Sequence, residues 1–321
     1  MEKDGSRIGI EPLAIGIEIG GTKIQVGIGS SSGQLLPDGI LQSQVVHEHG
    51  AEGIRHNLIS MIKESLGAIH LKLSDVCKIG IGFGGIVDTN SGVILKSYQI
   101  DGWNNFPLKG WAEEQWGKPV FIQNDASVAG LAETLHGRGR GYSRIFYMTL
   151  GSGVGGGWIL DGKVDEGQGY GAAEIGHTWV PDLVSGAPVE LEQICSGWSI
   201  GRRAQLAALK QKTLMTDLVE AIDRIDAKIV YSAAEQGDDV ANCILVETCQ
   251  TLGLAIGNIV ALLHPERIIL GGGVSLMGPL FWNTIKEEAR SRMMVAFASH
   301  VDVVQAKLKE NVVVIGALCL E

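Results

Sequence analysis

The sequence has few cysteines, and they do not form a metal-binding or redox motif. No two of them lie in a Cys-x-x-Cys pair, the spacing typical of zinc ribbons and thiol redox centres. Scattered cysteines of this kind usually pack as small apolar side chains in a reducing compartment. They are Cys77, Cys195, Cys243, Cys249 and Cys319.

Positive charge is also scarce. Lysine and arginine number 26 against 36 aspartates and glutamates, which gives a net charge of −10. An acidic protein repels the phosphate backbone of nucleic acids unless it carries a local basic patch. The nearest candidate patch is residues 136–144, HGRGRGYSR, which is short and glycine-rich and is typical of a loop. We therefore expect no nucleic-acid partner.

Long apolar runs and a targeting segment are missing as well. No apolar run is predicted to be long enough to cross a bilayer. The first residues lack the basic segment, apolar core and small-residue cleavage site of a signal peptide. The sequence therefore predicts a cytoplasmic protein without a membrane partner. Its 321 residues, 45% hydrophobic and 19% charged, fit a globular chain of two domains.

Glycine, by contrast, is abundant. The chain has 45 glycines in 321 residues, which is about twice the average usage, and no collagen period explains them. We expect them at specific turns. Residues 16–29, GIEIGGTKIQVGIG, show the pattern best: two alternating strands flank a polar tip at 20–23. Such a tip is either an ordinary hairpin turn or a phosphate site in which backbone N–H groups approach an anion.

Strands and helices alternate along the chain. Strand patterns at 13–29 and 78–95 enclose residues 53–69, whose apolar side chains recur at helical intervals. Residues 144–164 repeat the plan of the first hairpin, so we expect an α/β protein with two similar domains. We place a first lobe at residues 1–124, completed by 305–321, and a second lobe at 125–304.

Three other segments match known motifs, but the residues around them do not fit the structure that each motif requires. Residues 151–156 satisfy GxGxxG, but a strand pattern follows where a dinucleotide site needs a helix. Residues 16–21 have P-loop spacing, but Thr22-Lys23 reverses the required order. Residues 197–201 match GxSxG without a preceding strand, so Ser199 is interpreted as the first turn of a helix.

Asn124-Asp125 and the segment EIGH carry the polar chemistry. Asn124 and Asp125 follow a strand and precede a helix, where either could cap the helix or the carboxylate could take a proton from a hydroxyl. Glu174 and His177 stand three residues apart, close enough to meet one ligand. A single histidine is otherwise more often structural.

In this order, the motifs resemble those of the ROK family of sugar kinases and repressors, within the actin-like ATPase superfamily. The segments that carry the resemblance are GIEIGGTK, GIGFGGIVD, NDASVAG, LGSGVGGG, EIGH, LEQICSG and HPERIILGGGVS. The resemblance implies two actin-like (RNase H-like) lobes with a cleft for ATP and sugar between them. It favours the phosphate reading of the first hairpin.

The resemblance also implies roles for single residues. Asp125 would be the catalytic base. The sugar hydroxyls would be held by Gly84, Gly85, Asn124, Glu174, His177 and Glu192. ATP would be held by Gly20, Gly21, Thr22, Lys23, Thr149, Gly151, Gly153, Gly271, Gly272 and Gly273.

The chain departs from the family pattern in three places. Glu18 stands where family kinases usually have Asp, which changes the geometry around the Mg²⁺ of ATP. A cysteine run that binds structural zinc in relatives is replaced by TWVPDLVSGAPVELE, with Glu190 at the last cysteine, so we expect no zinc. The first hairpin begins near residue 15, so we expect no helix-turn-helix of the kind that precedes the kinase domain in the repressors.

The expected activity is therefore ATP-dependent phosphorylation of a hexose, with ATP and Mg²⁺ as cofactors. Glucose is the expected substrate, and a homodimer is usual among relatives. Two alternatives stay open: a kinase for another sugar, such as N-acetylmannosamine, fructose or allose, or a sugar-binding protein of the same fold that has lost phosphoryl transfer.

Overall fold

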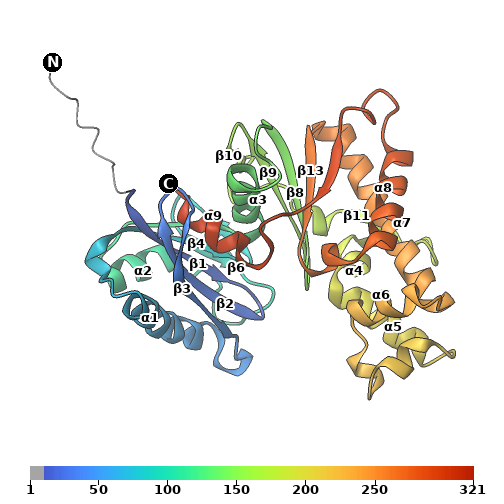
Figure 1. The fold of residues 1–321 in the computed structure, drawn as a ribbon, viewed down its shortest axis with the longest axis horizontal. Helices are drawn as coiled ribbons and strands as arrows, with labels where there is room; N and C mark the ends of the chain where they lie inside the picture. The colour runs from blue at the N-terminus through green and yellow to red at the C-terminus, as the bar shows by residue number, and fades with distance from the viewer. Residues whose placement is uncertain (1–10) are drawn as a thin grey trace. The chain divides into compact units, whose positions relative to one another are not determined.

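The computed structural model describes residues 11–321, which divide into two compact units (Figure 1). Unit 1 contains residues 11–132, 169–171 and 311–321 of the described chain. Unit 2 contains residues 133–168 and 172–310. The division falls inside α3 (Asp125–His136).

Unit 1 is built on a five-stranded sheet in the order β3-β2-β1-β4-β7. The first three strands form an antiparallel meander, and β4 and β7 continue the sheet parallel to β1. The predicted hairpin at 13–29 is the β1–β2 pair. The strands are β1 (Leu13–Ile19), β2 (Lys23–Ser30), β3 (Leu35–Gln44), β4 (Val76–Phe83) and β7 (Val120–Asn124).

Helices α1 and α2 share one apolar core with this sheet, and a small hairpin extends from it. The predicted helix at 53–69 is α1, which begins three residues earlier than its periodic pattern. The elements are α1 (Gly50–Ala68), α2 (Leu108–Trp116), β5 (Ile86–Asp88) and β6 (Val93–Lys96), with 3-10 turns η1 (His47–His49) and η2 (Leu73–Asp75). The 3-10 turn η7 (Lys309–Asn311) spans the point where the chain passes from unit 2 back to unit 1.

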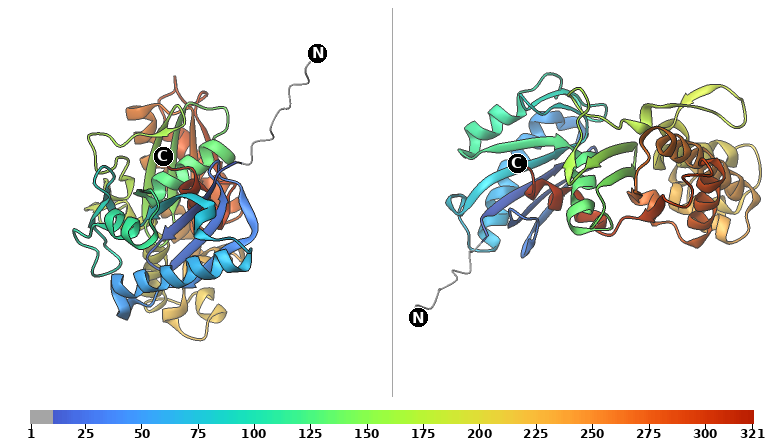
Figure 2. Two further views of the ribbon diagram at one scale, coloured as in Figure 1. Left: turned by 90° about the vertical axis from the view of Figure 1, so that its left-hand side faces the viewer. Right: turned by 90° about the horizontal axis from the view of Figure 1, so that it is seen from above.

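The C-terminal helix α9 (Val312–Leu318) packs on strands β1, β2 and β4 (Figures 1 and 2). Successive side chains of a strand point to opposite faces of the sheet. In β4, Ile79 and Ile81 belong to the core shared with α1, whereas a Cβ on Gly80 would collide with the backbone of α9. Gly16 in β1 meets α9 in the same way. Many glycines therefore lie inside strands, which corrects our expectation that they serve turns.

Unit 2 repeats the plan of unit 1, with strand order β10-β9-β8-β13-β14. Here too an antiparallel meander comes first, and two parallel strands follow on the other side of the first strand. The strands are β8 (Arg144–Leu150), β9 (Val154–Leu160), β10 (Lys163–Val164), β13 (Arg267–Gly271) and β14 (Asp302–Gln305). The two similar α/β halves expected from the sequence are present.

Helices α4 to α8 pack on the unit 2 sheet around a second apolar core. The elements are η3 (Ile175–His177), β11 (Trp179–Pro181), β12 (Pro188–Glu190), α4 (Glu192–Cys195), α5 (Gly197–Ala208), η4 (Leu214–Leu218), η5 (Ile222–Arg224), α6 (Ala227–Glu235), α7 (Asp239–Leu263), η6 (Gly273–Leu276) and α8 (Pro279–Arg292). Ser199 lies in the first turn of α5, as predicted, where its N–H donates to the capping hydroxyl of Ser196.

Helix α7 corrects our expectation about membrane-length apolar segments. Its 25 residues are long and apolar enough to cross a bilayer, with a mean hydropathy of 1.5 over the most apolar stretch. Uncharged polar residues such as Thr248, Thr251 and Asn258 interrupt its apolar run, so the sequence shows no continuous apolar segment there. In the folded chain, 67% of that stretch is buried inside the protein, so α7 serves as a core helix of unit 2.

Candidate active site

The tip of the β1–β2 hairpin is a tight, polar turn. The Gly20 N–H donates to the Lys23 carbonyl at 3.0 Å, and the Gly84 N–H donates to the Ile19 carbonyl at 2.9 Å. The Lys23 ammonium lies 3.1 Å from a carboxylate oxygen of Glu18. The predicted Gly20–Lys23 site is therefore a compact turn at the end of β1, with Gly84 hydrogen-bonded beside it.

Asn124 and Asp125 have separate positions at the start of α3. Asn124 Oδ1 accepts from the N–H groups of Ala126 and Ser127, at 2.9 and 3.2 Å, and its amide donates to the Gly85 carbonyl. Asn124 therefore caps the helix. Asp125 Oδ1 accepts from the Ala126 N–H at 2.8 Å, and its other oxygen would lie 3.4 Å from a Cβ built on Gly84. Gly84 thus leaves space in front of the Asp125 carboxylate.

The second glycine hairpin lies between β8 and β9 in unit 2. The Gly151 N–H donates to the Gly153 carbonyl at 2.9 Å. Glu192, at the start of α4, accepts from the Val154 N–H at 2.8 Å, and a Cβ on Gly153 would collide with its carboxylate. The structure therefore brings the predicted residue Glu192 onto the predicted hairpin. Sequence reading gave no sign of this contact.

The three glycines at the carboxyl end of β13 lie beside the second hairpin. Gly271 pairs with Thr149 across the parallel strands β13 and β8. Gly272 has a left-handed φ of 79°, and a Cβ there would meet the Leu150 carbonyl oxygen at 2.5 Å. Gly273 opens the 3-10 turn η6. Loops at the carboxyl ends of neighbouring parallel strands are the usual ligand position in α/β sheets.

Carboxylates and a histidine gather around the EIGH segment. His177 Nδ1 lies 3.4 Å from Glu190 Oε1, across the start of the β11–β12 hairpin. Loss of hydration raises the pKa of the Glu174 carboxyl; the neighbouring His177 opposes this rise and the charge of Glu192 adds to it. Glu174, His177 and Glu192 are therefore close enough to interact, as the spacing predicted for the first two.

Gln99 is a site neighbour that the sequence did not reveal. Its side chain covers Gly21, where an added Cβ would collide with the amide. The Ser97 hydroxyl accepts from the N–H groups of Gln99 and Ile100, at 3.4 and 3.2 Å, and fixes this loop. No periodicity or motif in residues 97–100 marks the contact.

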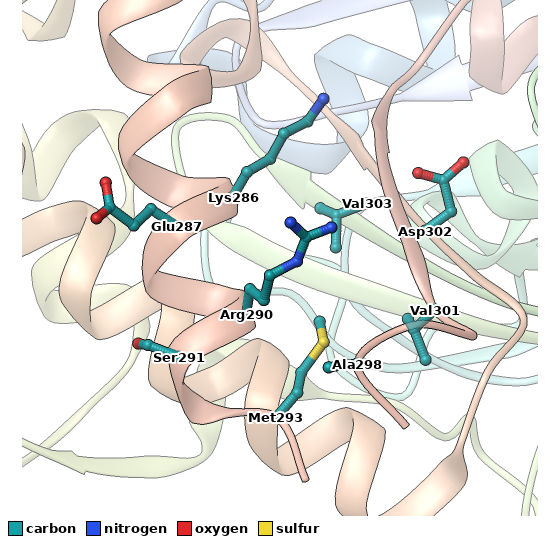
Figure 3. A pocket seen from close by; sticks show the side chains of 9 residues that line it. All are labelled: Lys286, Glu287, Arg290, Ser291, Met293, Ala298, Val301, Asp302 and Val303. Atoms are coloured by element: carbon teal, nitrogen blue, oxygen red, sulfur yellow. The ribbon is translucent and has the colours of Figure 1, made fainter. Parts of the chain in front are cut away.

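A separate hollow of unit 2 contains none of these residues. It lies between α8 and the segment leading into β14, and Figure 3 shows Lys286 and Arg290 on the helix, across from Asp302. Met293, Val301 and other apolar side chains line the rest of it. Its cations are exposed on the helix surface, and it is not part of the candidate site.

Two sheets of the same strand order, each with a glycine hairpin between its first two strands, define a two-lobed α/β protein of the actin-like ATPase class. The ROK family model matches residues 14–321, and the chain belongs to this family.

Individual relatives agree with this assignment. The chain is 31% identical to a glucokinase of Thermotoga maritima, with 94% of this chain and 95% of that one covered. It is 26% identical to a xylose repressor of Caldicellulosiruptor bescii, with 95% and 77% covered. The structure of a ROK family glucokinase from Streptomyces griseus in complex with glucose and AMPPNP is similar, with a TM-score of 0.80, 32% identity and 95% and 98% covered.

Proposed function

We propose that this ROK protein transfers the γ-phosphoryl group of ATP to glucose and forms glucose 6-phosphate. The glucokinases among its relatives support the reaction and the substrate. The single observation that carries the chemistry is the position of Asp125. Asn124 caps α3, Asp125 uses Oδ1 toward the Ala126 N–H, and its other carboxylate oxygen faces Gly84, whose missing Cβ leaves space beside it.

In the proposed reaction, Asp125 accepts the proton of the attacking sugar hydroxyl. The hydroxyl oxygen forms a bond to the γ-phosphorus, the bond from that phosphorus to the β,γ-bridging oxygen breaks, and ADP leaves. The N–H groups of the two glycine hairpins and the loop 271–273 hold the nucleotide. Mg²⁺ bound to ATP would offset the phosphate charge. Glu18, beside the first hairpin, would offer a carboxylate oxygen, the kind of ligand that this ion prefers.

The proposed sugar contacts follow from the chemistry of the side chains. Carboxylates accept hydrogen bonds from hydroxyls, whereas Asn and His can donate or accept. Asn124 already uses its amide toward Gly85, so its remaining capacity is small. In the proposal, most of the sugar recognition therefore falls to Glu174, His177 and Glu192.

A sugar-binding protein without phosphoryl transfer is the second candidate. Xylose repressors among the relatives favour it, as does the Glu18–Lys23 ion pair, since Glu18 reaches one methylene further than the usual Asp and is engaged by a cation. Kinases for other sugars form the third possibility.

A coupled assay of ADP release separates these candidates. Purified protein with Mg²⁺ and ATP is offered glucose, N-acetylmannosamine, fructose, allose and xylose, and sugar binding is measured in parallel by calorimetry. We expect turnover with glucose at the highest kcat/KM of the panel. Binding of a sugar without ADP release would support the non-catalytic candidate and exclude the kinase.

Glu174→Gln is expected to weaken sugar binding without destabilising the protein. The loss of a charged acceptor corresponds to about 10- to 100-fold in KM for glucose. Because the folded protein raises the pKa of Glu174, the wild type loses stability as pH rises from the unfolded to the folded pKa of this group. The neutral glutamine has no such loss, so its melting temperature should equal or slightly exceed that of the wild type at neutral pH.

Melting curves near neutral pH and near pH 4, together with glucose KM values, test this prediction. The difference in melting temperature should shrink at the acid pH, where the Glu174 carboxyl of the folded wild type is mostly protonated and therefore uncharged, like the glutamine. Unchanged KM together with a lower melting temperature would show that Glu174 is a structural residue outside the sugar site.

A further inference from the structure

The segment that replaces the cysteine run of zinc-bearing relatives folds as a β-hairpin. β11 and β12 pair in antiparallel register, with Trp179 opposite Glu190 and Val180 opposite Val189. At the tip, Asp182 Oδ1 accepts from the N–H groups of Val184 and Ser185, at 3.0 and 2.7 Å. Backbone pairing and this capped turn therefore hold the segment in shape without thiolate ligands.

The hairpin places Glu190 beside His177. The Leu191 N–H donates to the Thr178 carbonyl at 2.9 Å, and Leu191 is fully buried, so the base of the hairpin is anchored in the core. His177 precedes Thr178 in the chain, and Glu190 precedes Leu191. The His177 Nδ1 atom lies 3.4 Å from Glu190 Oε1. The distance is longer than a direct N–H···O bond, so the contact is electrostatic in this conformation.

The residues of this region do not suit a structural zinc ion. Structural sites are closed by four ligands, mostly Cys and His, and residues 178–191 contain neither. Within residues 11–321, no three His, Cys, Asp or Glu side chains come together as a metal-binding group. The ring of His177 must therefore be oriented by protein groups.

We propose that Glu190 is the positioning residue of His177 and does what a metal does in zinc-bearing relatives. This inference rests on the proposed sugar kinase. A carboxylate facing Nδ1 favours the neutral tautomer with its proton on Nδ1. Nε2 then keeps its lone pair and accepts a hydrogen bond from a sugar hydroxyl.

Two other carboxylates near the His177 ring, those of Glu174 and Glu192, have other contacts or roles. Glu192 accepts from the Val154 N–H at the glycine hairpin. Glu174 precedes η3 and interacts with His177 through its charge, and it is itself a proposed sugar contact. Glu190 is the carboxylate at ion-pair distance from Nδ1.

A kinetic cycle tests the assignment. Glu190→Ala should raise the glucose KM about tenfold, the lower end of the effect of removing an orienting carboxylate, with kcat and the ATP KM within about twofold of the wild type. Glu190→Gln keeps a hydrogen-bond acceptor, so its glucose KM should lie between those of the wild type and Glu190→Ala. The exposed Glu220 of the same unit provides a matched control, and Glu220→Ala should change nothing.

The cycle is completed in a His177→Ala background, where Glu190→Ala should add no further increase in KM. The assignment would be overturned if Glu190→Ala raised the glucose KM equally in the wild-type and His177→Ala backgrounds. It would also be overturned if Glu190→Ala left the glucose KM of the wild type unchanged.

A spectroscopic measurement is independent of sugar turnover. Long-range ¹H–¹⁵N spectra of the free protein at alkaline pH should show His177 protonated on Nδ1 in the wild type and shifted toward the Nε2–H tautomer in Glu190→Ala. The same tautomer in both proteins would overturn the inference even in an active kinase. A protein that phosphorylates no sugar but shows this shift would refute the proposed function and leave the role of Glu190 supported.

Discussion

Asp125→Asn is expected to lower kcat for glucose by about two to four orders of magnitude, the usual contribution of a general base. Asparagine has the same shape and can still accept from the Ala126 N–H, so α3 should begin as in the wild type. The amide has no basic oxygen that could take the hydroxyl proton. Sugar affinity, measured by calorimetry without ATP, should change less than tenfold.

Asp38→Asn is a matched control for this variant. Asp38 is an exposed carboxylate of the same unit with a left-handed φ of 59°, a conformation that asparagine tolerates well. Its kcat should equal that of the wild type. Near-normal turnover of Asp125→Asn would remove Asp125 from the catalytic step and leave it a structural role at the helix start.

Gly80→Ala is expected to destabilise unit 1 by about 3 kcal/mol, the upper range for overpacking a filled interior. A Cβ on Gly80 would collide with the carbonyl oxygen of Ala317 in α9, and backbone atoms yield less than side-chain tips. Either α9 lifts from the sheet or β4 shifts. Urea unfolding followed by circular dichroism should show an earlier transition in the variant.

Gly67→Ala makes the same chemical change in open space. Gly67 lies in α1 with no neighbouring atom within 4 Å of an added Cβ. Alanine favours a helix over glycine by roughly 0.5–1 kcal/mol, so this variant should unfold slightly later than the wild type. Equal free energies of unfolding for Gly80→Ala and Gly67→Ala would contradict the close packing of α9 against Gly80.

Local patterns explain why much of the fold could be predicted. Alternating residues on both sides of a glycine-rich tip are a strong local signal for a hairpin, so the β1–β2 and β8–β9 pairs followed from the sequence. Residues 312–321 were less clear, since the three valines at 312–314 favour a strand as much as a helix. They form α9 because burial against the sheet outweighs their propensity.

Part of the candidate site could be predicted because some of its residues are neighbours in the chain. Residues adjacent in sequence, such as Asn124-Asp125 and the EIGH segment, showed their chemistry directly. Contacts across long sequence separations gave no local signal: Glu192 on the second hairpin and Gln99 over Gly21 depend on how distant segments pack.

The sequence by itself determined the family, the two α/β halves and their glycine hairpins, because these depend on local periodicity and motif order. Only the tertiary structure decided which role each polar or small residue takes. It made Asn124 the cap of α3, placed Glu190 beside His177, and put Gly16 and Gly80 under α9. Whether a glycine serves a turn or a close approach depends on what packs above it, which the neighbouring residues in the chain do not encode.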